Sequence, residues 1–238
     1  MSMKHVILLF AVLVCHLCSL AQVTFAKYYD AGGTYTNSLC ELPSGNLFTG
    51  IAFANGISIL DPEGQVIHQR DYLIFPFLEL QSTRISSGNE VHFVGAFFLD
   101  SCTNCPGLAM YDPVIGRMDT LGNVSNVQYY EMNSEYDKNA AAELIIMNDK
   151  SIITWGREDS FFILKADSNL NHVWSRQFAD QHHGDFQFIK ELPGGDLLAG
   201  INMDTAGAVV ARMDATGNFL WCKSYIRPKG RVHDALVE

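Results

Sequence analysis

A short segment that occurs four times along the chain constrains the fold more than any other feature. Residues 42–50 (LPSGNLFTG) return as residues 192–200 (LPGGDLLAG), and looser copies occupy residues 87–95 and 148–156. Internal similarity at a regular period of this length is typical of repeat architectures. The chain is therefore expected to consist of tandem copies of one structural unit.

Each repeat shows the same order of strand-like segments. An extended stretch and a Gly/Asn/Asp turn lead into an apolar strand that ends at glycine, and after a variable loop a third strand ends at aspartate. The glycines are Gly50, Gly95, Gly156 and Gly200, and the aspartates are Asp61, Asp112, Asp167 and Asp214. A fourth strand follows, clearest at residues 173–178 and 219–225. The alanine-rich residues 139–146 have helical propensity, but their place in the repeat predicts a strand.

The turns that follow the aspartates have a clear physical basis. At residues 61–64 and 214–218 an Asp opens the turn and a Gly comes near its end. The Asp side chain can accept hydrogen bonds from backbone amides of the turn, and Gly adopts a positive φ without steric cost. Strands joined by such short turns pair antiparallel.

Four antiparallel strands in each unit of roughly 40–50 residues are typical of β-propeller blades. We therefore predict an all-β, propeller-like fold of about four antiparallel four-stranded blades, incomplete or cut short. The predicted repeats cover residues 35–76, 77–138, 139–182 and 183–232, and residues 233–238 look like the start of a fifth. A β-sandwich is the alternative fold, although it would not require the same pattern to recur.

The last two repeats resemble the exported propeller repeats that are common in secreted proteins of Bacteroidetes. The matching residues in the fourth repeat are Gly194, Gly195, Leu197, Gly200, Asp214, Gly217, Asn218, Trp221, Lys223 and Tyr225, and those in the third are Lys165, Asp167 and Trp174. The first two repeats have no Trp at the corresponding position. This resemblance implies export and a propeller, and it implies no single activity.

The N-terminus has the pattern of an export signal. Lys4 supplies a positive charge, residues 6–15 are apolar, and the small residues Ser19 and Ala21 precede a predicted cleavage site before Gln22. A second possible site follows Ala26. A membrane anchor is the alternative, but a bilayer span needs about 20 apolar residues and this run is interrupted at His16. We predict a signal peptide over residues 1–21, no membrane span after cleavage, and a secreted, periplasmic or cell-surface location.

The negative net charge of the chain argues against two classes of binding partner. The chain carries a formal net charge of −10 and shows no basic stripe. Nucleic acids and anionic membranes attract basic proteins, so neither is an expected partner. A protein or a glycan remains as the expected ligand.

Four cysteines follow the predicted cleavage site: Cys40, Cys102, Cys105 and Cys222. Cys102 and Cys105 form a C-x-x-C segment before Pro106 and Gly107, which suggests a loop. A redox pair of the thioredoxin type would need a helix start, and a zinc site would need two further ligands. We favour a local disulfide between Cys102 and Cys105, or two free thiols, and expect no cofactor.

Other candidate sites have simpler structural explanations. Residues 180–185 (DQHHGD) hold the densest set of metal-ligating side chains, but adjacent His residues on a strand point to opposite faces. The Asp turns lack the dense ligand run of a calcium loop. The three tryptophans, Trp155, Trp174 and Trp221, could stack on sugars, yet packing between blades is the simpler role.

The sequence contains no catalytic motif, so the expected function is that of an exported, non-catalytic binding scaffold. The variable loops between the second and third strands occupy equivalent positions in the four repeats and would gather on one face. The candidate binding residues in these loops are Asn55, Asp100, Asn104, Arg157, Glu158, Asp159, Asp204 and Thr205. The alternatives are a secreted glycan hydrolase with a carboxylate pair from different blades, or a fragment of a longer propeller protein.

Overall fold

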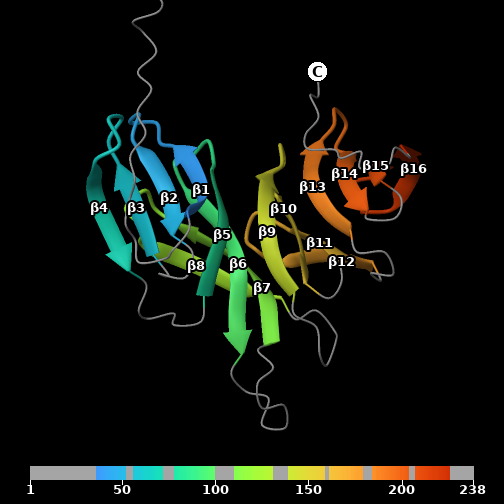
Figure 1. The fold of residues 1–238 in the computed structure, drawn as a ribbon, viewed down its shortest axis with the longest axis horizontal. Coiled ribbons are helices and arrows are strands. Elements are labelled where there is room, and N and C mark those ends of the chain that lie inside the picture. Colours follow the sequence, from blue (N-terminus) through green and yellow to red (C-terminus); the bar gives the residue numbers. More distant parts are fainter. Residues whose placement is uncertain are drawn as a thin grey trace, which may run out of the picture. The chain divides into compact units, whose positions relative to one another are not determined.

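The computed structural model describes residues 36–51, 56–71, 78–99, 110–130, 139–158, 161–178, 184–203 and 207–225. These residues form four antiparallel four-stranded sheets, and none of them is helical. The predicted all-β propeller fold with four-stranded blades is therefore confirmed. Figure 1 shows the sheets following one another in sequence order.

In every sheet the strands are paired in chain order. Sheet A contains β1 (Thr36–Glu41), β2 (Leu47–Ile51), β3 (Gly56–Leu60) and β4 (Val66–Asp71); sheet B contains β5 (Leu78–Ile85), β6 (Val91–Leu99), β7 (Met110–Met118) and β8 (Val124–Tyr129); sheet C contains β9 (Asn139–Ile146), β10 (Ile152–Glu158), β11 (Phe161–Ala166) and β12 (His172–Phe178); sheet D contains β13 (Gly184–Glu191), β14 (Leu197–Met203), β15 (Gly207–Met213) and β16 (Phe219–Tyr225).

The observed strands confirm one sequence-based expectation and correct another. The alanine-rich segment is strand β9, as its place in the repeat predicted. The third strand of the second repeat was placed wrongly, because β7 continues through Asp112 and Pro113 to Met118 and its turn begins at Asp119. Pro113 interrupts the apolar pattern, although its register partner Ala96 shows that it lies within the β6–β7 pairing.

The four Asp turns, which join the third and fourth strands, share one hydrogen-bond pattern. They comprise residues 61–65, 119–123, 167–171 and 214–218. In each, the backbone N–H of the Asp donates to the carbonyl of the fifth residue, and the N–H of the fourth residue donates to the Asp carbonyl. The Asp Oδ1 atom also accepts from the fifth residue's N–H. The recurring Asp is therefore explained by turn geometry.

The four inner turns, which join the first and second strands, are equally regular. They comprise residues 42–46, 86–90, 147–151 and 192–196. Their fourth residue has a positive φ in each case, and it is Gly45, Asn89, Lys150 or Gly195. Two inner turns therefore place a residue with a side chain in a conformation that favours glycine.

The recurring glycines stand opposite a β-bulge. The first strand of every sheet has one extra residue near the glycine of the second strand, at residues 37, 81, 142 and 187. In sheet D the ring of Phe188 lies over Gly200, where a Cβ atom would overlap the ring. A bulge bends its strand and increases the local twist, so these glycines belong to the shape of the sheet.

Alternating side chains on the middle strands fill the spaces between successive sheets. One cluster lies between sheets A and B and includes Phe48 and Phe93, a second lies between B and C and includes Phe162, and a third lies between C and D and includes Trp155. Strand β11 is buried along its whole length because its two faces serve different clusters. The predicted burial of Trp155 and Trp174 is confirmed.

The outer edges of sheets A, B and C also contact the Asp turn of the next sheet. Arg70 of β4 donates to Asn123. The Tyr130 hydroxyl, just after β8, donates to the Leu170 carbonyl at 2.8 Å. Trp174 Nε1 of β12 donates to the Ala215 carbonyl at 3.1 Å. We call this recurring contact the outer latch. Among the described residues the four sheets do not close into a ring.

Candidate functional site

The loops predicted to form a binding face lie between the second and third strands of each sheet. Arg157 and Glu158 belong to β10, where Arg157 is in register with Phe161. The other six candidates, Asn55, Asp100, Asn104, Asp159, Asp204 and Thr205, lie outside the described residues, as do Cys102, Cys105 and residues 180–183. The binding-face hypothesis therefore stays a prediction.

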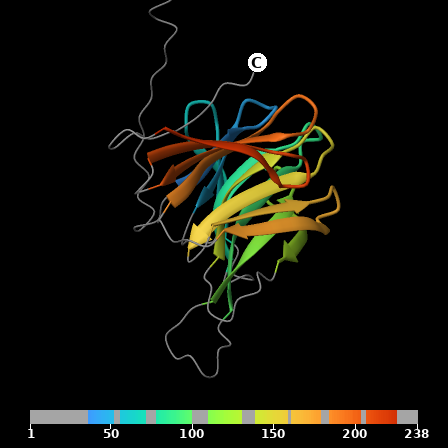
Figure 2. The same cartoon turned by 90° about the vertical axis from the view of Figure 1, so that its right-hand side faces the viewer.

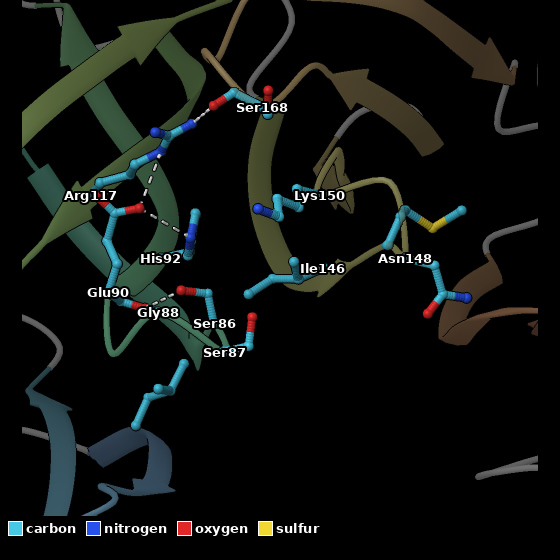
Figure 3. A pocket seen from close by; sticks show the side chains of 12 residues that line it. Ser86, Ser87, Gly88, Glu90, His92, Arg117, Ile146, Asn148, Lys150 and Ser168 are labelled. Carbon is cyan, nitrogen blue, oxygen red and sulfur yellow. Dashed lines mark hydrogen bonds and ion pairs between the residues drawn. The ribbon is translucent and has the colours of Figure 1, made fainter.

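A pocket occurs in a different place, between sheets B and C. Its walls come from the two inner turns of these sheets, from β6 and β7, and from the Asp turn of sheet C. Its volume is about 710 Å³, which is within the usual range for small-molecule sites. Figure 3 shows the lining side chains, which are Ile85, Ser86, Ser87, Gly88, Glu90, His92, Arg117, Ile146, Met147, Asn148, Lys150 and Ser168.

The sheet B wall carries a polar cluster of a buried His92 with the partly exposed Glu90 and Arg117. The carboxylate atom Oε2 of Glu90 is 3.4 Å from His92 Nε2 and 3.7 Å from Arg117 Nε. Arg117 also donates through Nη2 to the Ser168 carbonyl of the Asp turn of sheet C. The cluster therefore joins the two sheets at the pocket (Figure 3).

The histidine of this cluster is held in its neutral form. Burial, and secondly the positive charge of Arg117, lower the pKa of His92 to about 4. Neither His92 Nδ1 nor Arg117 Nε has a hydrogen-bond partner in the described part of the chain, although both atoms are buried. Unpaired buried polar atoms are uncommon, and two of them in one wall distinguish this region from the rest of the inter-sheet contacts.

Lys150 faces this wall from the inner turn of sheet C. Its backbone has a φ of 65°, and its side chain is exposed. Figure 3 shows the ammonium group pointing into the pocket. Lys150 forms no ion pair with any residue that the structure describes. A cation at the mouth of a pocket, with no anion assigned to it, can bind an anionic group of a ligand.

Hydroxyl and amide groups dominate the remaining polar lining. Ser86, Ser87, Ser168 and Asn148 contribute donors and acceptors. Glu90 is the only carboxylate among the lining residues. The pocket therefore combines one unpaired cation with neutral hydrogen-bonding groups, and its lining does not contain a carboxylate pair.

Sequence reasoning missed this site because its residues come from two repeats and from separate strands and turns within each. One signal was available at the inner turns. The fourth residue is glycine in the first and fourth repeats, and Asn89 or Lys150 in the second and third. These two turns are the ones that border the pocket. The absence of glycine at the fourth turn position therefore distinguished the two repeats that form the pocket from the other two.

Metal and membrane sites are not evident in this part of the protein. No group of three or more His, Cys, Asp or Glu side chains that could hold a metal ion occurs among the described residues. Within the same residues, no helix is long and apolar enough to cross a bilayer. Cys40 and Cys222 are free thiols.

The packing between blades that was expected of Trp221 stays a prediction. Trp221 and Trp174 occupy the same position after their Asp turns, and both were expected to pack between blades. Trp174 is 9% exposed, whereas Trp221 is 38% exposed. The reason is that the turn of sheet D covers Trp174, while no described residue lies in the equivalent place over Trp221.

Comparisons with known proteins identify the fold. No family model and no curated protein sequence matches the chain. Among solved structures, a protein of unknown function from Bacteroides caccae is similar at a TM-score of 0.57 and 13% identity, over 82% of this chain and 63% of that one.

Two further structures show the same likeness. The Dos1 propeller has a TM-score of 0.56 and 14% identity, with 85% of this chain and 51% of that one covered. The periplasmic gluconolactonase PpgL of Pseudomonas aeruginosa has a TM-score of 0.52 and 12% identity, with 79% and 54% covered. The chain thus spans between about half and just under two thirds of these structures. At these identities the likeness shows the fold alone, which is a β-propeller.

Proposed function

We propose that this protein is an exported, non-catalytic binding scaffold that takes an acidic saccharide into the pocket between sheets B and C. The observation that carries the proposal is the unpaired Lys150 ammonium, which points into a pocket lined by hydroxyl and amide groups. A carboxylate on the ligand would pair with Lys150. The sugar hydroxyls would exchange hydrogen bonds with the serines and Asn148.

Three observations support export and a binding role. The N-terminal sequence has the pattern of a signal peptide. One of the structures that this chain resembles is a periplasmic protein. The single carboxylate in the pocket lining favours binding over glycoside hydrolysis, which ordinarily uses two carboxyl groups.

The binding test compares a uronic acid oligosaccharide with its neutral counterpart by isothermal titration calorimetry. Binding of the acidic sugar alone, with an affinity that falls as salt is added, is expected because screening weakens the contact to Lys150. Lys150→Met should weaken binding about tenfold, which corresponds to about 1.4 kcal/mol. The matched control is Lys223→Met, which removes an exposed lysine on β16. Equal binding by the wild type and Lys150→Met would contradict the proposal.

The same samples test the hydrolase alternative. Release of new reducing ends from the oligosaccharide, abolished by Glu90→Gln, would establish a catalytic role. Export has a separate test, since the mature protein recovered outside the cytoplasm should begin at Gln22. An N-terminus at Met1 in that fraction would contradict the signal-peptide prediction.

A further inference from the structure

The outer latch between sheets C and D shows which groups contact the tryptophan on the fourth strand of a repeat. Trp174 of β12 covers Gly217 of the next sheet, and a Cβ atom on that glycine would lie 2.8 Å from the indole ring. The indole N–H donates to the Ala215 carbonyl. Arg176, two residues further along β12, donates to the Thr216 carbonyl at 3.2 Å. One Asp-x-x-Gly turn therefore receives three contacts from the preceding sheet.

Sheet D has the same two donor side chains on its fourth strand, a tryptophan and a cation two residues later. Trp221 stands seven residues after Asp214, as Trp174 stands seven residues after Asp167. Lys223 takes the place of Arg176, and the two cations lie over their respective rings at 5.5 Å and 5.8 Å from the ring centres. The two side chains of sheet D are thus arranged like a latch that is already closed elsewhere in the same molecule.

No Asp turn of a following sheet accepts these donors among the described residues. All seven residues of β16 are exposed, whereas β12 has one buried residue, Trp174, and three of intermediate exposure. Exposed apolar side chains are concentrated on β16, where Phe219, Leu220, Trp221 and Tyr225 are each more than a third exposed. Figure 1 shows β16 at the end of the series of sheets. Exposed apolar groups at one edge mark an interaction surface.

We propose that Trp221 and Lys223 dock a further four-stranded sheet of the same repeat type, with its Asp-x-x-Gly turn under the indole ring. The occupant is defined by the chemistry of the closed latch between sheets C and D. It must present a glycine with positive φ, because Gly217 adopts a φ of 80° and any side chain there would meet the ring. It must also offer turn carbonyls to the indole N–H and the lysine. The docking surface is independent of the pocket, which lies between sheets B and C.

The test extends the full chain after Glu238 with a duplicate of residues 190–225. The join keeps the repeat register, because Asp234 aligns with Asp185 in the sequence. Strands β14 to β16 and the Asp turn of the duplicate have the sequence that folds against Trp174 in the native protein, and residues 233–238 take the place of residues 184–189 of β13. Labelling with 5-fluorotryptophan gives a fluorine resonance for Trp221, assigned with Trp221→Phe. In the extended chain this resonance should lose most of its H2O/D2O solvent shift.

Two matched variants identify the contact. Gly217→Val, made only in the duplicate, should restore the solvent shift of Trp221 because the Cβ branch blocks the ring. Trp221→Ala in the extended chain should leave the duplicate unprotected from hydrogen exchange. A duplicate that stays unfolded, or that folds while Trp221 remains solvent-exposed, would overturn the proposal. Self-association of the unextended chain that Trp221→Ala abolishes would identify a second copy as the occupant, and would overturn it as well.

Discussion

At the scale of single residues, the polar wall of the pocket combines a neutral histidine with a cation and an anion. His92 is 5% exposed, and its environment favours the uncharged ring although Glu90 lies 3.4 Å away. Burial removes the water that would solvate an imidazolium, and Arg117 adds repulsion. The wall is therefore suited to near-neutral conditions and sensitive to acid.

The protonation of His92 should make stability fall as the solution is acidified. The folded pKa is about 4 and the unfolded value is about 6.5, so the unfolded chain binds the proton first. Stability is fully present above pH 6.5 and is lost as pH falls toward 4, by up to about 3 kcal/mol. Urea titrations at pH 7.5 and 4.5 should show this loss in the wild type and a smaller loss in His92→Gln. An equal loss in both proteins would rule out His92 as the cause.

Lys150 carries a conformational cost that a glycine would remove. Its φ of 65° costs an ordinary residue about 1 kcal/mol relative to glycine. Lys150→Gly should therefore raise the free energy of unfolding by up to about 1 kcal/mol while weakening ligand binding. Chemical denaturation measures the first effect and calorimetry the second. Gly45→Lys, in the equivalent turn of sheet A, should be destabilising, and stabilisation there would contradict the explanation.

At the scale of strands and turns, the Asp-x-x-Gly-Asn turn of sheet D forms a compact network that presents Gly217 to Trp174 of sheet C. In sheet D, Asp214 accepts from the backbone amides of Thr216 and Asn218 and from their side chains. These hydrogen bonds, led by the amide of Asn218, lower the pKa of the Asp214 carboxyl to about 2. The turn therefore keeps its shape over the whole physiological pH range, and the latch has a fixed target.

The closed latch between sheets C and D can be tested with a double-mutant cycle. Trp174→Ala should cost about 3–5 kcal/mol, as expected for a large buried side chain. Gly217→Ala should cost about 2 kcal/mol or more, because it combines a positive φ with overlap against the ring. The double mutant should be less destabilised than the sum of the two, since the overlap disappears with the ring. Additive effects in denaturant titrations would show that the two residues do not interact.

At the scale of the whole protein, stability depends on neighbouring sheets covering one another. Sheets B and C each contribute to two of the three hydrophobic clusters, whereas sheets A and D each contribute to one. Figure 2 shows the sheets from the end of the series, with sheet D facing the viewer. In repeat proteins such nearest-neighbour contacts set the local stability.

Amide hydrogen exchange should be slower in the sheets that have a neighbour on both sides than in the terminal sheets. The amides of β7 and β10–β11 should exchange most slowly and those of β16 most quickly, because β11 is buried throughout and β16 is exposed throughout. Mass spectrometry of exchanged peptides over residues 36–225 measures the difference. Uniform protection across the four sheets would mean that they unfold as one cooperative unit.

Local patterns were enough to predict the repeat, the strand order within each sheet and the Asp turns, because these depend on alternation, on turn glycines and on an aspartate that accepts hydrogen bonds from nearby amides. Sequence reasoning failed at Asp112, where Pro113 hid the continuation of β7 to Met118, and it left the packing of Trp221 undecided because the burial of that side chain depends on a neighbouring sheet. The pocket was decided by tertiary structure alone. Glu90, His92 and Arg117 of sheet B meet Lys150 and Ser168 of sheet C only when the two sheets pack together, and no local pattern records which surfaces a sheet will share with the next.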